Sequence, residues 1–173
     1  MTDTAAATPS FATKIKTLHW AIAVLVLIML YGGFTLSPET ATLHFGTGLV
    51  VLVLMVIWLA LRGSSPRPAY PPMPRWQEIA AKATHHSLYA LVTLQPVFGL
   101  LLVTTSKGEP MAYGVIPLKI AQNDTLHEIG EWLHAVNGYL IAALVAFHVL
   151  GALYHHVVLK DNVLKRMLPF AKG

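Results

Sequence analysis

The fold class follows from one stretch of the chain, WLHAVNGYLIAALVAFHVLGALYHHVVL, which covers residues 132–159. It contains no Asp, Glu, Lys or Arg, and it is longer than the about 20 apolar residues that a helix needs to cross the hydrocarbon core of a bilayer. The stretch therefore predicts a transmembrane helix. Its histidines indicate a function, because a polar ring inside a membrane span is costly.

Three further stretches are long and apolar enough to cross a membrane, at about residues 18–36, 43–61 and 83–105. Pro96 lies inside the third, where neighbouring helices make a proline tolerable and a kink is expected. The four stretches together predict an all-α membrane protein, a bundle of four transmembrane helices.

The connecting segments differ in composition. We expect a tight turn at residues 37–42, a Pro-rich surface loop at 62–82 and a longer loop at 106–131 that Gly and Pro interrupt. Residues 1–10 are polar and lack the basic start of a secretory signal, so we expect a short disordered tail there. Residues 11–173 then form a single transmembrane domain.

The overall composition supports a membrane protein and excludes several kinds of site. Hydrophobic residues make up 55% of the chain and charged residues 12%, whereas soluble domains carry about 25% charged residues. The chain has no Cys, which excludes disulfides, thiolate zinc sites, iron–sulfur clusters and covalently attached c-type haem. Any haem must be held without a covalent link.

The basic residues are concentrated on one side of the expected bundle. Lys and Arg in the loops determine orientation, since they collect on the cytoplasmic side. If both termini are cytoplasmic, the outside holds only Lys107 and Lys119, and the inside holds the rest: Lys14, Lys16, Arg62, Arg67, Arg75, Lys82, Lys160, Lys165, Arg166 and Lys172. We therefore expect a multi-pass membrane protein with both termini in the cytoplasm, and lipid rather than nucleic acid accounts for its positive charge.

Two histidines of the last span are placed near its two ends. His134 and His148 lie on one face of the helix, about 40° from eclipsed and about 21 Å apart along its axis. The hydrocarbon core is about 30 Å thick, so each ring lies near one side of the membrane. Each of the two histidines then needs a partner at its own depth.

The first two spans supply these partners. His19 lies at the inner end of the first span with His148, and His44 lies at the outer end of the second span with His134. Two histidine pairs across a bundle core are suited to two b-type haems with imidazole ligands on both sides of the iron. Small residues near these histidines, including Gly48 and Gly138, leave bare helix surface for a porphyrin, although glycines also let membrane helices pack closely.

The remaining histidines are less suited to this role. His127 lies among acidic residues, outside the expected apolar core. The other four are at the inner ends of their helices, where we interpret them mainly as interfacial residues: His85, His86, His155 and His156. As a cluster beside the inner pair, they could instead bind a polar ligand and transfer protons.

At the level of motifs, the chain resembles the bacterial cytochrome b561 family of di-haem membrane proteins. The matching pieces are LHW at 18–20, LHFGTG at 43–48, GEPMAYGVIP at 108–117, the His134–His148 spacing and YHHVVLKDNVLKRMLP at 154–169. The resemblance implies four haem ligands on helices 1, 2 and 4, which carry over onto His19, His44, His134 and His148. The Glu that often follows the third ligand in the family is Ala135 here.

The resemblance also implies electron transfer linked to ubiquinone. Some family members resemble superoxide oxidases, which pass electrons from superoxide to ubiquinone. By this analogy His155 is the residue nearest the quinone, with His156 beside it.

Three alternatives remain open at the level of sequence. A haem anchor subunit of a dehydrogenase or hydrogenase would need a soluble redox partner. A metal-ion transporter would use the intramembrane histidines, but such sites cluster near the midplane, and no Asp or Glu lies within any span here. A purely structural membrane protein would bind no cofactor. The sequence indicates neither the electron donor nor the oligomeric state.

Overall fold

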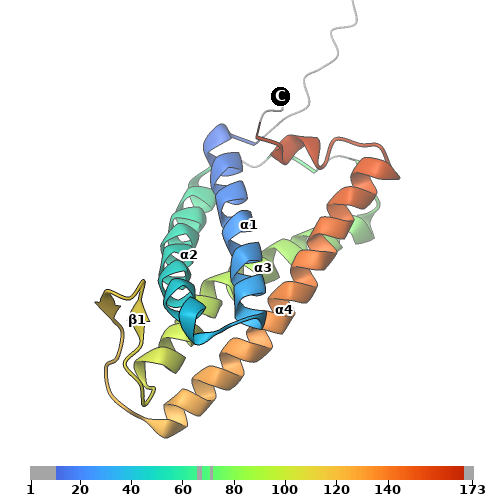
Figure 1. Cartoon of the computed structure of the whole chain (residues 1–173). Coiled ribbons are helices and arrows are strands. Elements are labelled where there is room, and N and C mark those ends of the chain that lie inside the picture. The colour runs from blue at the N-terminus through green and yellow to red at the C-terminus, as the bar shows by residue number, and fades with distance from the viewer. Residues whose placement is uncertain (1–10, 66–67, 71, 170–173) are drawn as a thin grey trace, which may run out of the picture.

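The computed structural model describes residues 11–65, 68–70 and 72–169. Its main elements are α1 (Thr13–Phe34), α2 (Pro38–Ser64), α3 (Arg75–Thr104) and α4 (Asp124–Val157), followed by a short 3-10 helix, η1 (Lys165–Met167). Within the described residues, α1, α2, α3 and α4 are the four helices that are long and apolar enough to cross a membrane. The prediction of an all-α, four-span membrane fold is confirmed (Figure 1).

Each helix begins before the apolar stretch that predicted it, so three predicted connections are partly wrong. Most of the expected turn at 37–42 is the first turn of α2, part of the expected Pro-rich loop is the start of α3, and the last part of the loop at 106–131 is the start of α4. Hydropathy detects only the membrane-embedded part of a helix. Its polar ends are determined by local capping instead.

Two of these helix starts have recognisable caps. Ser37 and Thr40 form a capping box at α2, with Pro38 in the first turn. The side chain of Asn123 accepts a 3.0 Å hydrogen bond from the backbone N–H of Leu126 at the start of α4. Ser and Asn oxygens satisfy N–H groups that the first helical turn leaves without partners.

A small antiparallel hairpin, β1 (Met111–Ala112) with β2 (Ile116–Pro117), lies between α3 and α4 in the chain. It turns at Tyr113 and Gly114, which both have positive φ, 52° and 72°. The backbone N–H of Tyr113 donates a 2.8 Å hydrogen bond to the carbonyl of Thr42. The Tyr113 ring covers Gly46, where an added Cβ would lie 2.4 Å from ring atoms, so α2 needs a glycine there.

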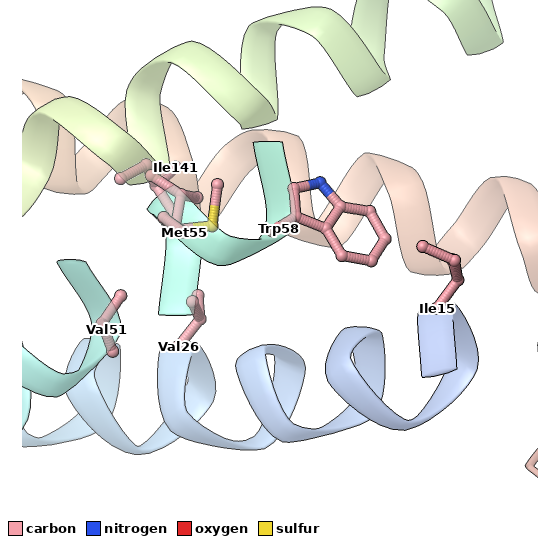
Figure 2. Packing of buried hydrophobic residues seen from close by; sticks show 7 residues of the cluster. Ile15, Val26, Val51, Met55, Trp58 and Ile141 are labelled. Atoms are coloured by element: carbon pink, nitrogen blue, oxygen red, sulfur yellow. The ribbon is translucent and has the colours of Figure 1, made fainter. Parts of the chain in front are cut away.

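The helices pack mainly with their neighbours in the chain: α1 with α2, α2 with α3, and α3 with α4. The α3 and α4 backbones approach closely at Gly130 of α4, where an added Cβ would lie 2.7 Å from the backbone N of Leu102. Apolar side chains from α1, α2 and α4 meet along the middle of the bundle (Figure 2), together with Val92 of α3; they are Ile15, Val26, Val51, Met55, Trp58 and Ile141.

The bundle has two distinct ends. At one end, which we call the terminal end, the backbone N–H of Phe11 donates to the carbonyl of Arg166, and the Trp20 indole donates a 2.8 Å bond to the carbonyl of Met167. These bonds hold the C-terminal segment beside the start of α1 (Figure 1). The opposite end, which we call the hairpin end, carries the α1–α2 turn, the hairpin and the start of α4.

Candidate functional site

Four histidines from three helices form two pairs, one toward each end of the bundle. At the hairpin end, the ring centroids of His44 (α2) and His134 (α4) are 6.1 Å apart, with an interplanar angle of 76°. At the terminal end, the centroids of His19 (α1) and His148 (α4) are 6.2 Å apart, at 67°. The structure thus brings together the same partners that depth along the helices indicated.

The hairpin-end pair lines a cavity of about 310 Å³ between the helices. That volume lies at the lower end of the range typical of small-molecule sites, about 300–1,000 Å³. Most of the lining is apolar, and the polar side chains besides the two histidines include Gln95 and Glu131. Glycines from all four helices form parts of its wall: Gly33, Gly48, Gly99 and Gly138.

The His134 ring is held in a defined orientation. Its Nδ1 lies 3.1 Å from the backbone carbonyl oxygen of Gln95 on α3. Since a carbonyl can only accept, Nδ1 carries the proton and Nε2 is left as the basic nitrogen. Across the cavity, Nδ1 of His44 is buried without a hydrogen-bond partner among the described residues. Both imidazoles therefore have a nitrogen available to a ligand.

The terminal-end pair has a different environment, made of aromatic rings and a third histidine. The His19 ring lies 5.8 Å from Trp20 and 6.0 Å from Trp58. The His85 ring of α3 lies 5.2 Å from His148, closer than His19 does, and stacks against Tyr89. His85 is thus part of this site.

Sequence reasoning interpreted His85 mainly as an interfacial residue and gave a place beside the inner pair only as the alternative, which the contact with His148 favours. A periodicity argument could have found it. His85 precedes Val92 by seven residues and Pro96 by eleven, so all three lie on one face of α3. Val92 and Pro96 are buried, which identifies that face as the one turned to the bundle.

The other histidines have separate local partners. His86 bonds through Nδ1 to the carbonyl of Lys82, one turn earlier in its own helix. His127 bonds to the carbonyl of Leu102, which ties α4 to α3. His155 bonds through Nδ1 to Asp161 at 2.5 Å, and His156 is exposed. Within the described ranges, no hydrogen bond or ring contact joins His85 or His86 to His155 or His156.

Both lysines of the hairpin end are paired with carboxylates. Lys107 lies 3.3 Å from Asp124, and Lys119 lies 2.7 Å from Glu109. The same end also carries Glu39, Glu128 and Glu131. Its local charge is therefore negative, and neither lysine is an isolated positive charge.

Residues 10–170 match the family described as prokaryotic cytochrome b561. The chain belongs to this family. The match spans nearly the whole chain, including both histidine pairs, so the family resemblance seen in the motifs is confirmed.

Named relatives align over most of their length. The chain is 30% identical to cytochrome b561 homolog 1 of Escherichia coli, over 90% of this chain and 94% of that protein. It is 29% identical to a probable superoxide oxidase, CybB, of Yersinia pestis, with the same coverage. It is 31% identical to a cytochrome b562 of Cereibacter sphaeroides, over 92% of this chain and 96% of that one.

The family implies a b-type haem, and the hairpin-end site fits such a group. A haem is a flat, mostly apolar ring whose iron takes nitrogen ligands. The cavity is apolar, glycines leave room along its wall, and two imidazoles face each other across it. With four apolar helices and membership of this family, the chain is a membrane b-type cytochrome.

Proposed function

We propose that this chain is a di-haem b-type cytochrome that transfers electrons across the membrane, to or from a ubiquinone-type quinone of the respiratory chain. In this proposal His44 and His134 hold one haem iron, and His19 and His148 hold the other. Gly48 and Gly138 form part of the wall beside the first haem. A bound haem b supplies a one-electron iron couple.

The spacing of the histidine rings carries the proposal. Two metal–nitrogen bonds of about 2 Å each, plus two ring radii of about 1 Å, place the centroids of opposed imidazole ligands roughly 6 Å apart. The observed centroid distances are 6.1 Å and 6.2 Å. Because rings in ordinary contact also lie about 4.5–7 Å apart, the spacing supports the proposal together with two further observations: a histidine pair recurs at each end of the bundle, and one pair lines an apolar cavity.

Two imidazole ligands on each iron favour electron transfer over oxygen chemistry, because they leave no coordination position open. The residues of the chain then have three tasks: to hold the iron, to exclude water and to set the environment of each site. His134 is oriented by the Gln95 carbonyl, and His19 is enclosed by Trp20 and Trp58.

The distribution of charge supports a cytoplasmic terminal end. Lys14, Lys16, Arg62 and Arg75 lie at the helix ends on that side, and the C-terminal segment adds Lys160, Lys165 and Arg166. The hairpin end has only Lys107 and Lys119, both paired with acids. An excess of Lys and Arg marks the cytoplasmic side of membrane proteins.

We place the quinone site at the terminal end, beside His155. The His155 side chain is only 13% exposed and bonds to Asp161, whose other carboxylate oxygen accepts from the backbone N–H of Val163. An imidazole that a carboxylate holds in a fixed orientation is suited to accepting and donating protons. Quinone reduction requires such protons as well as electrons.

The test is the haem content of the purified protein. Oxidised and dithionite-reduced spectra, with pyridine haemochrome quantification, should give two b-type haems per chain. One haem per chain would overturn the di-haem assignment. A colourless protein after expression with ample haem would overturn the whole proposal and bring the metal-transport alternative forward.

A second candidate is superoxide oxidation, which the name of the Yersinia pestis relative supports. An anionic substrate is best captured by a positive surface. Both hairpin-end lysines are neutralised by Asp124 and Glu109, so this chain offers little attraction at that end. The test compares quinone reduction driven by superoxide in the wild type and in a Lys107→Ala/Lys119→Ala variant. Activity that falls in the variant supports the role, and a wild type without activity excludes it.

A further inference from the structure

The α3 helix carries none of the four proposed ligands, but within the described residues it makes the hydrogen bonds that join His134 to another helix. Gln95 of α3 and His134 of α4 exchange two hydrogen bonds. The His134 ring donates through Nδ1 to the backbone carbonyl of Gln95 at 3.1 Å, and the Gln95 amide donates to the backbone carbonyl of His134 at 3.1 Å. Ring and backbone of His134 are thus both fixed to one residue.

Asn137 completes this arrangement. Its side chain is almost fully buried, at 4% exposure. Its amide donates to the Gln95 side-chain oxygen at 2.7 Å and to the backbone carbonyl of Leu91 at 2.9 Å. A buried amide is costly unless its bonds are made, and here both donors of Asn137 are used. The network therefore holds the Gln95 side chain in the position from which it bonds His134.

Gly99 lets the ring reach α3. An added Cβ at this position would lie 3.0 Å from Cε1 and 3.2 Å from Nδ1 of the His134 ring. Even a methyl group would push the ring away by a few tenths of an ångström. The ring is therefore pressed against the α3 backbone, in the wall of the cavity that it lines with His44.

The other three paired histidines lack this support. Within the described part of the chain, the ring nitrogens of His19, His44 and His148 make no hydrogen bond to another residue. The hydrogen bond on the far ring nitrogen of a metal-binding histidine fixes the ring orientation and raises the basicity of the ligand nitrogen.

We propose that Gln95, Gly99 and Asn137 form a positioning site for His134, which fixes the orientation and protonated nitrogen of that ring and so tunes the haem at the hairpin end alone. This inference rests on the proposed function, since it requires a haem at His134. A more basic ligand nitrogen stabilises the oxidised iron. Weakening the network therefore raises the reduction potential of this haem and loosens its binding, while the terminal-end haem is unchanged.

The experiment compares two variants that act in different ways. Asn137→Leu removes the amide that holds Gln95, and Gly99→Ala leaves every polar group in place but displaces the ring. Thr93→Val is the control for the first, because the Thr93 hydroxyl bonds only within α3, to the carbonyl of Tyr89. Gly63→Ala is the control for the second, because a Cβ there meets nothing within 4 Å.

The readouts are the haem-to-protein ratio and a redox titration of the reduced α band. The component that disappears in His134→Leu identifies the hairpin-end haem. In both test variants we expect that component alone to move to higher potential, with haem retention on the order of 10-fold weaker. Both controls should titrate like the wild type.

Two results would overturn the proposal: titration of both test variants like the wild type, or equal shifts of both components. A failure of the proposed function gives a different result, because the wild type would then lack two components or His134→Leu would retain both. If Asn137→Leu does not fold, Gly99→Ala with its own control still decides the question.

Discussion

The two ends of the bundle hold histidine pairs with nearly the same ring spacing but different surroundings. At the hairpin end the pair lines a cavity with glycine walls, and one ring is tied to the α3 backbone. At the terminal end the pair is packed among Trp20, Trp58 and His85. If both pairs hold haems as proposed, the unequal surroundings would give two chemically identical haems different reduction potentials.

The third helix accounts for much of this difference, although it carries none of the four paired histidines. Toward the hairpin end it supplies a carbonyl, an amide and a bare glycine surface. Toward the terminal end it supplies His85, stacked on Tyr89. A helix without ligands is free to vary its contacts at the two sites independently.

The largest expected effect is the loss of haem from one end of the bundle while the other end keeps its haem. We expect His134→Leu and His148→Leu each to lose about one of two haems per chain, since each change would remove one of the two histidines that would hold that haem. Pyridine haemochrome quantification measures the loss. His127→Leu is the control, because that ring bonds to Leu102 rather than facing another histidine. Retention of both haems in His134→Leu and His148→Leu would contradict the ligand assignment.

The next effect concerns proton transfer, which we expect only at the terminal end. His155→Ala should lower the rate of quinone reduction by about 100-fold or more, because general acid–base groups contribute at least that factor. Both haems should stay bound. His156→Ala, at the exposed neighbour, is the matched control and should retain the rate. Loss of haem from His155→Ala would instead make His155 a ligand or a structural residue.

A smaller effect is expected from His85, which should influence the reduction potential at the terminal end alone. His85→Leu should retain two haems but change the potential of the terminal-end haem alone, since a polar ring 5.2 Å from His148 is replaced by an apolar one. His86→Leu, whose ring bonds to its own helix, should leave both potentials unchanged. A redox titration checks this. Loss of a haem in His85→Leu would mean that His85, and not His19, is the partner of His148.

The smallest effect lies in the surface charges of the hairpin end. Lys119→Ala removes the ion pair with Glu109 and should change the free energy of unfolding by less than about 1 kcal/mol, as is usual for exposed pairs. Thermal unfolding in detergent at low and high salt measures it. A change well above that value would show that this pair holds together the two segments that flank the hairpin.

Much of the fold could be predicted because membrane spans obey simple length and polarity rules. The four spans followed from apolar length, and the depth of each histidine followed from the rise per residue of a helix. The binding of iron by those histidines stays a prediction. Helix starts such as Pro38 and Asp124 were missed, because capping depends on a few polar side chains that a hydropathy pattern does not register. The suggested tail at 1–10 lies outside the described residues.

By itself, the sequence determined that this protein has four spans and that its histidines fall at two depths, because both properties depend only on distance along a helix axis. Only the tertiary structure decided the contacts that surround the two histidine pairs. That packing brought His85 to His148, placed the Gln95 carbonyl on the His134 ring, and paired both hairpin-end lysines with acids. These contacts depend on how closely two helices approach and on the side chains that meet there, and residue spacing within one helix does not determine either.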